Sequence, residues 1–175
     1  MTMVGDVVPG MEELHTAARA LLETLDAAGI KLVTAESCTG GFLASLLTDI
    51  EGLSHGFDRG FVTYSKSAKQ QMLGIDRALI EHSGAVSGPV VRAMAQGSLD
   101  RSRGGLALAI TGFAGASDPD ESESPGVTYV AAAIPHQSWV YREDFGKRPR
   151  EDVRNLAAAA ALAAGMQAMA WKQAL

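Results

Sequence analysis

The chain has 175 residues, 47% of them hydrophobic, and a formal net charge of -5 at pH 7, so it is large enough for one packed domain and too acidic to bind nucleic acid through a basic face. Its single cysteine excludes an intrachain disulfide and a cysteine-based metal site, and it fits a reducing cytosol. No apolar run reaches the roughly 18 residues of a membrane-spanning helix, and the first residues lack the basic segment of a signal peptide, which predicts a cytoplasmic protein without a membrane partner.

Hydrophobic periodicity and turn residues predict alternating helices and strands behind a flexible leader at residues 1–10. The first predicted elements are a helix at 11–28, a strand at 31–36, a helix at 39–48, a strand at 57–65 and a helix that ends at Leu73. Helices at 76–82 and 87–101, capped by Asp76 and Ser87, precede a buried strand at 106–110. An acidic loop at 115–125, a hairpin of strands 126–134 and 137–145, and a helix over 149–171 follow. This order predicts a single α/β domain over 11–175, with three α/β/α layers and a mixed sheet covered on both faces.

The segment T-A-E-S-C-T-G-G, residues 34–41, lies where the first strand passes into a helix. The first N–H groups of a helix have no internal partner, so those of residues 38–41 can bind a phosphate or a developing oxyanion beside Ser37. A helix cap supplied by Ser37 or Thr39 is the plainer interpretation. Cys38 is a second candidate nucleophile, but no histidine base lies near it in sequence, and we interpret it as a buried side chain.

Tyr64 closes the second predicted strand, and Lys66 and Lys69 enter the following helix. A lysine in a site of low dielectric can lose its proton and act as the base for a serine, although isolated lysines are usually solvated surface charges. The spacing fits neither the Y-x-x-x-K pair of dehydrogenases nor an S-x-x-K pair. The four histidines have no metal-ligand spacing, and a serine–histidine–aspartate triad assembled in space stays an open alternative.

Two further segments are candidates for the walls of a pocket. Thr111-Gly112 follows a buried strand, at the end where α/β sheets collect their ligands. Arg148, Arg150 and Arg154 cluster at the start of the last helix and could hold a phosphate. Because cations at a helix N-terminus oppose the helix dipole, their placement requires a reason. Local pairing with Glu151 and Asp152 is the alternative.

Taken together, four segments make the sequence similar to the CinA C-terminal domain family, the nicotinamide-nucleotide amidohydrolases. They are T-A-E-S-C-T-G-G at 34–41, G-F-V-T-Y-S-x-x-A-K-x-x-x-L-G-I at 60–75, H-S-G-A-V-S at 82–87 and T-G-F-A-G at 111–115. Their order and spacing hold from about residue 11 to 172, which is nearly the whole chain. The first two segments are long and specific.

The resemblance implies a domain of three α/β/α layers that hydrolyses the carboxamide of nicotinamide mononucleotide to nicotinate mononucleotide and ammonia, without a cofactor or a metal. It implies Ser37 as the nucleophile, Lys69 as its base and Tyr64 as a residue of the site. The partners expected are the small nucleotide substrate and further copies of the chain, in a homodimer or higher homo-oligomer. The residues expected to bind substrate are Thr39, Gly40, Gly41, Thr111, Gly112 and Arg150.

The chain departs from the family around this expected site. Residues 116–125 are acidic where the family is glycine-rich and partly basic, with Glu123 at the usual lysine, and an acidic loop repels a phosphate. Lys66 and Arg148 are further departures, and they could restore the lost positive charge. The alternative to an amidase is therefore a substrate-shifted or non-catalytic pyridine-nucleotide-binding module of the same fold. Direct action on DNA, which the family's name suggests, conflicts with the acidic charge balance.

Overall fold

Within residues 3–5, 7–115 and 123–173, which the computed structural model describes, the chain forms five strands and six α-helices. The strands are β1 (Leu32–Glu36), β2 (Phe57–Val62), β3 (Leu106–Gly112), β4 (Val127–Ile134) and β5 (Gln137–Asp144). The helices are α1 (Met11–Ala27), α2 (Phe42–Thr48), α3 (Lys66–Leu73), α4 (Arg77–Ser83), α5 (Gly88–Asp100) and α6 (Arg150–Gln173), with a short 3-10 helix at Ser54–Gly56.

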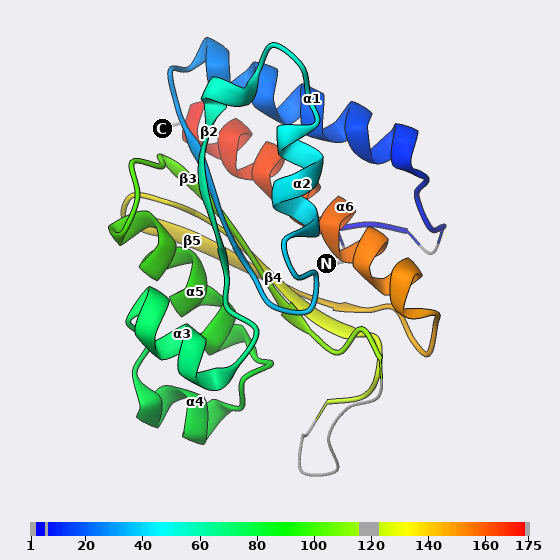
Figure 1. Cartoon of the computed structure of the whole chain (residues 1–175), viewed down its shortest axis with the longest axis vertical. Helices are drawn as coiled ribbons and strands as arrows, with labels where there is room; N and C mark the ends of the chain where they lie inside the picture. The colour runs from blue at the N-terminus through cyan, green and yellow to red at the C-terminus, as the bar shows by residue number, and fades with distance from the viewer. Residues whose placement is uncertain (1–2, 6, 116–122, 174–175) are drawn as a thin grey trace.

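The strands form one mixed sheet in the order β2-β1-β3-β4-β5 (Figure 1). β1 pairs in parallel with β2 and β3, whereas β3 with β4 and β4 with β5 are antiparallel. The connection from β1 to β2 contains α2. The connection from β2 to β3 contains α3, α4 and α5, and it passes β1 in the opposite direction. Right-handed connections that run in opposite directions lie on opposite faces of a sheet. Accordingly, α1, α2 and α6 cover one face and α3, α4 and α5 cover the other. The predicted three-layer α/β fold, with a hairpin and a long helix at its end, is confirmed.

Strand alternation divides the core between these two faces. In β3, the side chains of Leu106, Leu108 and Ile110 pack toward α1, α2 and α6, and those of Ala107 and Ala109 pack toward α5. Successive strand residues point to opposite faces, so one strand supplies both layers of the core. The small alanines leave room for the larger side chains of α5, and alanines of α6 pack against the larger side chains of the other face. β3 is therefore buried on both sides, as its all-apolar sequence predicts.

The predicted elements recur with small shifts at their ends. Asp76 and Ser87 cap α4 and α5 through their side chains, as expected. β2 ends at Val62 and not at residue 65, and the Thr63 N–H makes a last hydrogen bond to β1, to the Glu36 carbonyl oxygen at 2.7 Å. α2 begins at Phe42 and not at residue 39, a difference that changes the candidate site. The sequence also gave no sign of the 3-10 helix at residues 54–56.

The leader lies against the domain at several points. Met3, Val4 and Val8 contact the core beneath α1 and α6. The Met3 N–H donates to the buried Glu143 carboxylate at 2.6 Å, and Asn155 donates to the Pro9 carbonyl oxygen at 3.3 Å. The described part of this segment is thus tied to β5 and α6.

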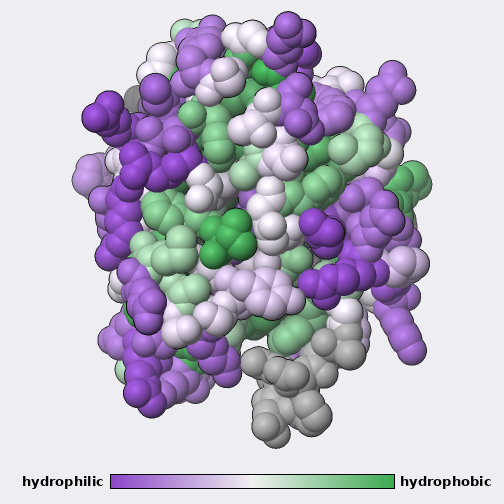
Figure 2. All heavy atoms as spheres, in the orientation of Figure 1, coloured by the Kyte–Doolittle hydropathy of each residue, from purple (hydrophilic) through white to green (hydrophobic). Residues whose placement is uncertain are grey.

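Polar and apolar side chains are unevenly distributed on the surface. Figure 2 shows hydrophilic side chains around the periphery of one face and apolar ones nearer its middle. One exposed apolar side chain is Val62, at the end of β2, which is an edge strand. Within the described residues, no helix combines the length and apolar character that crossing a membrane would require.

α3 and α5 cross closely at Gly97. A Cβ at this position would lie 3.1 Å from the Leu73 Cβ and would clash with the Leu73 carbonyl oxygen. Gly88, at the start of α5, has more room, since a Cβ there would meet the nearest atom, of Val140, at 3.6 Å.

We expect Gly97→Ala to lower the free energy of unfolding by about 1–3 kcal/mol, because overpacking forces the two helices apart. Gly88→Ala in the same helix should be neutral or slightly stabilising, because it loses no contact and restricts the unfolded chain. Urea denaturation followed by circular dichroism measures both. Equal stability of the two variants would contradict the close crossing.

Candidate active site

Ser37 stands in a tight turn directly after β1, at the carboxyl end of the parallel strands. Its N–H donates to the Ile110 carbonyl oxygen of β3 at 3.0 Å, and its own carbonyl oxygen accepts from the Gly40 N–H at 3.0 Å. Gly40 and Gly41 have φ angles of 62° and 95°, in the left-handed region that strongly favours glycine. The two glycines therefore let the chain reverse within a few residues and hold Ser37 at the edge of the sheet.

The carboxylate of Glu36 fills the N-terminus of α2. It accepts hydrogen bonds from the N–H groups of Gly41, Leu43 and Ala44 at 3.0, 3.0 and 2.9 Å. The predicted cap by Ser37 or Thr39 is therefore wrong, because the N-cap residue is Gly41 and the acceptor comes from the strand. The Gly41 N–H is likewise committed to Glu36 and is not a donor for a ligand. The sequence could not show that the side chain before Ser37 points back to the helix.

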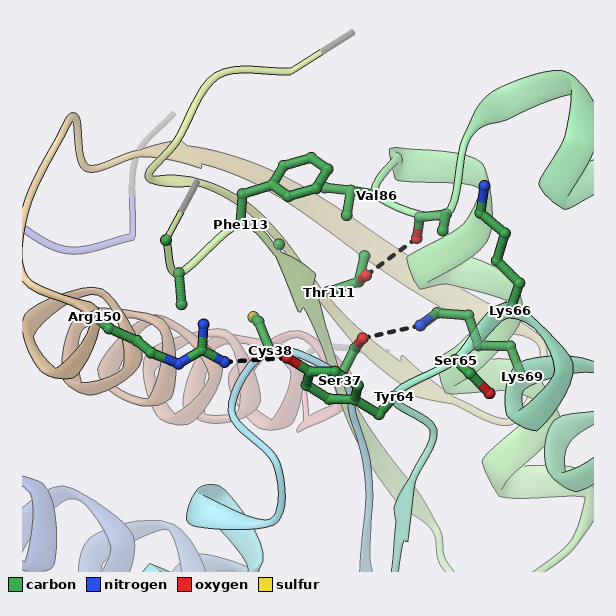
Figure 3. A pocket seen from close by; sticks show the side chains of 14 residues that line it. Ser37, Cys38, Tyr64, Ser65, Lys66, Lys69, Val86, Thr111, Phe113 and Arg150 are labelled. Carbon is green, nitrogen blue, oxygen red and sulfur yellow. Dashed lines mark hydrogen bonds between the residues drawn. The ribbon is translucent and has the colours of Figure 1, made fainter. Parts of the chain in front are cut away.

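Lys69 reaches Ser37 from α3 across the carboxyl end of the sheet (Figure 3). Its Nζ lies 2.9 Å from the Ser37 Oγ and 2.8 Å from the Thr63 carbonyl oxygen. The side chain is only 1% exposed, and this burial lowers the pKa of Lys69 to about 8. A thiolate at Cys38 would oppose the shift, but Cys38 stays a neutral thiol at this pH. The lysine is thus a partly deprotonated amine in contact with a serine hydroxyl.

Cys38 is buried, as the sequence predicts. It is 6% exposed, and desolvation by burial raises the pKa of its thiol to about 12. Since the thiolate and not the thiol is the nucleophile, Cys38 is inert at neutral pH. Of the two neighbouring candidates, only Ser37 has a base beside it.

A cavity of about 460 Å³ opens in front of the Ser37–Lys69 pair. Among the predicted site residues, the structure brings Ser37, Lys69, Tyr64, Thr111, Gly112 and Arg150 to its wall. Thr39, Gly40 and Gly41 do not line it, because the turn directs them toward α2 and away from the opening. The remaining described wall consists of Cys38, Ser65, Lys66, Ala85, Val86, Phe113, Ala114 and Gly115. Ala85 and Val86 belong to the segment at 82–87, which matches the family pattern, but no property of these two residues in the sequence indicated that they line the site.

The three arginines at and just before the start of α6 have separate roles. Arg150 enters the cavity on the side opposite Lys66 and Lys69, and its guanidinium donates to the Tyr64 hydroxyl at 3.3 Å (Figure 3). Arg154 donates to the Thr39 carbonyl oxygen at 2.9 Å and stacks over the Phe42 ring, so it supports the Ser37 turn from outside the cavity. Arg148 donates to the Phe145 carbonyl oxygen at 2.6 Å. A joint phosphate site of all three is therefore not formed.

Glu123 does not face the cavity. Its carboxylate pairs with Arg142 at 2.8 Å and accepts a hydrogen bond from the Tyr129 hydroxyl. The hydrogen bond from Arg142 is the main cause that lowers the pKa of Glu123. The charge of Glu123, at the family's usual lysine position, is thus paired with Arg142 of β5. The rest of the acidic loop, residues 116–122, lies outside the described residues.

The described wall of the cavity carries cations and no carboxylate. Lys66, Lys69 and Arg150 contribute basic groups in a chain whose net charge is -5. None of the four histidines belongs to the wall, so Ser37 has no histidine partner there and the triad alternative finds no support. Within the described residues, no group of three or more histidine, cysteine or acidic side chains could hold a metal ion. The site can therefore attract an anion and present a serine hydroxyl to it.

The fold and this pair define a class: three-layer α/β domains with a serine–lysine site at the carboxyl end of a parallel strand. Residues 14–169 match the family model of the CinA C-terminal domain, and the chain belongs to this family. It is 41% identical over 150 residues to the nicotinamide-nucleotide amidohydrolase PncC of Escherichia coli K12, covering 86% of this chain and 91% of that protein.

Longer proteins and solved structures show the same relationship. A CinA-like protein of Syntrophobacter fumaroxidans is 39% identical over 164 residues, which span 90% of this chain but 38% of that protein. The crystal structure of a competence/damage inducible protein from Agrobacterium tumefaciens superposes with a TM-score of 0.85 at 34% identity, covering 94% of this chain and 98% of the other. A CinA superfamily protein from Escherichia coli superposes with a TM-score of 0.84 at 34% identity, covering 89% and 90%.

We expect Cys38 to resist alkylation by iodoacetamide at pH 7.5 in the folded protein, because its thiol is buried and protonated. Mass spectrometry of native and urea-unfolded samples measures the modification. Complete labelling of the unfolded sample serves as the control. Rapid labelling of the native protein would show a reactive thiolate and would reopen Cys38 as the nucleophile.

Proposed function

We propose that the protein is an amidohydrolase that releases ammonia from the carboxamide of nicotinamide mononucleotide, with Ser37 as nucleophile and Lys69 as base. The observation that carries the proposal is the 2.9 Å contact between the Lys69 Nζ and the Ser37 Oγ, beside an open cavity. The names of the relatives support the substrate, since the PncC proteins of Escherichia coli and Shigella flexneri are called nicotinamide-nucleotide amidohydrolases.

The neutral Lys69 amine can take the proton of Ser37. With a pKa of about 8, about a tenth of the lysines are neutral at pH 7, against less than about one in a thousand at the ordinary lysine pKa. The Thr63 carbonyl oxygen accepts one amine hydrogen and aims the lone pair at the serine. The Ser37 Oγ then attacks the carboxamide carbon and forms a tetrahedral intermediate.

The intermediate needs donors for its oxyanion and a proton for its leaving group. Cys38, the residue after the nucleophile, lines the cavity, and the N–H at this chain position supplies an oxyanion donor in other serine hydrolases. Protonated Lys69 gives its proton to the departing nitrogen, so ammonia leaves and a Ser37 ester remains. Water, deprotonated by Lys69, then hydrolyses the ester and releases the carboxylate product.

The shape and charge of the cavity support an anionic substrate. Its volume of about 460 Å³ is within the range of small-molecule sites, roughly 300–1,000 Å³. Arg150 and Lys66 flank the opening from opposite sides and can attract a phosphate. Tyr64 is 64% exposed and held by Arg150, so its ring can contact a planar pyridine. The non-catalytic alternative is based in part on repulsion between the acidic loop and a phosphate. Because Glu123 is paired with Arg142, this one carboxylate contributes less to such repulsion.

We expect Ser37→Ala and Lys69→Arg each to reduce ammonia release from nicotinamide mononucleotide by about a thousandfold or more, as loss of a nucleophile or its base does elsewhere. Coupled detection of ammonia measures the rate, and thermal unfolding checks the fold. Lys172→Arg, at the exposed end of α6, is the matched control and should retain full activity. A folded wild type that is thermally stabilised by the nucleotide but releases no ammonia would favour the binding-module alternative.

The rate should also follow the titration of Lys69. Since the neutral amine is the base, kcat/KM is expected to rise about tenfold per pH unit at low pH, and to level off above about pH 8. Rates measured between pH 5.5 and 9.5 in buffers of constant ionic strength give the profile. A rate that falls as pH rises from 6 to 8 would contradict a lysine base.

A further inference from the structure

Glu36 connects the two halves of the candidate site. It is the last residue of β1 and is only 1% exposed. Its main-chain carbonyl oxygen accepts from the Thr63 N–H at 2.7 Å, and the Thr63 carbonyl oxygen in turn accepts from Lys69. Its side chain turns the other way and accepts the three N–H groups at the start of α2. One residue therefore touches both the anchor of the base and the turn that carries the nucleophile.

The carboxylate acts over an unusual distance along the chain. A helix cap normally comes from the N-cap residue itself, usually serine, threonine, aspartate or asparagine. Here the N-cap residue is Gly41, which has no side chain, and the acceptor stands five residues earlier. The hydrogen bonds therefore close a loop around residues 37–40, with Ser37 as its first member. A buried charge is costly unless it is fully hydrogen-bonded, and three N–H groups and the helix dipole supply that compensation.

Both ends of the loop are fixed by independent contacts. The Ser37 N–H is held by β3, and the Gly41 N–H is held by Glu36. Gly40 and Gly41, within this loop, have left-handed backbone angles. Without the carboxylate, the loop would keep its attachment to β3 and the Arg154 contact at Thr39, but it would lose the three hydrogen bonds that tie it to the N-terminal amides of α2. The position of Ser37 would then be less tightly constrained.

We infer that Glu36 is a positioning residue, which holds the Ser37 turn in its reactive geometry by binding the N-terminal amides of α2. The inference rests on the proposed function, in that Ser37 is taken to be the nucleophile. Glu36 itself does not belong to the described wall of the cavity. Its contribution is geometric, and a misplacement of about an ångström can cost about a hundredfold in rate.

The test compares Glu36→Gln with Asp76→Asn in the full chain. A glutamine keeps the size of the side chain, but its NH2 group faces an N–H donor and cannot accept. Asp76 is the matched control, since it caps α4 by accepting from the Ala78 N–H at 2.9 Å and lies outside the cavity wall. Two rates are measured on each protein: ammonia release from nicotinamide mononucleotide, and labelling of Ser37 by an alkyl fluorophosphonate. In the labelling reaction the Ser37 Oγ bonds to phosphorus, fluoride leaves, and the serine proton passes to Lys69.

We expect Glu36→Gln to fold, with kcat and the labelling rate both reduced by about a hundredfold and with KM changed by less than about threefold. Asp76→Asn should leave the Tm and both rates close to those of the wild type, because the asparagine oxygen can still accept from the Ala78 N–H. If Glu36→Gln labels Ser37 at a rate within about threefold of the wild type, Glu36 is only a helix cap and the inference is overturned.

Three other outcomes are decisive. If Glu36→Gln does not fold, Glu36→Asp keeps the charge but shortens the side chain by one methylene, and labelling as fast as in the wild type would overturn the inference. If the wild type labels at Ser37 but releases no ammonia, the proposed substrate fails while the labelling rates still decide the role of Glu36. A wild type that does not label at Ser37 would overturn the inference, because no positioned nucleophile would then exist.

Discussion

The contact between the buried amine of Lys69 and the hydroxyl of Ser37 is the interaction on which the site depends. Burial of an amine is unfavourable while it carries a charge, so the pKa of Lys69 falls to about 8 and the group becomes a base near neutral pH. The fold maintains this arrangement by packing α3 closely against α5 at Gly97 and by offering the Thr63 carbonyl oxygen to the amine. A less buried lysine would be an ordinary surface cation.

Two carboxylates of the described residues around the cavity, those of Glu36 and Glu123, are engaged away from its described wall. Glu36 is bound by backbone N–H groups of α2, and Glu123 is paired with Arg142. Neither carboxylate reaches the described wall, where Lys66 and Arg150 lie on opposite sides of the opening. The net charge of the chain therefore affects which partners its whole surface attracts. The charged side chains that line the cavity determine the charge of the ligand that the cavity attracts.

The relatives place these features in a shared scaffold. The solved structure from Agrobacterium tumefaciens and this chain superpose with a TM-score of 0.85, although only 34% of their residues are identical. The fold thus persists through extensive substitution of side chains. In this chain the departures expected from the family pattern lie in the loop at 116–125, at Lys66 and at Arg148. The Ser37–Lys69 contact is nevertheless present in this chain.

The sequence by itself determined the order and type of the elements, because strand alternation, helical periodicity and capping residues such as Asp76 and Ser87 act over short distances. It also placed Ser37 and Lys69 among the candidates. Only the tertiary structure decided that these two meet, that Gly41 is committed to Glu36, and that Arg154 holds a backbone carbonyl while Arg150 enters the cavity. The physical reason is that each of these facts depends on how β1, α3 and α6 approach one another in space, and local patterns of residues carry no record of that approach.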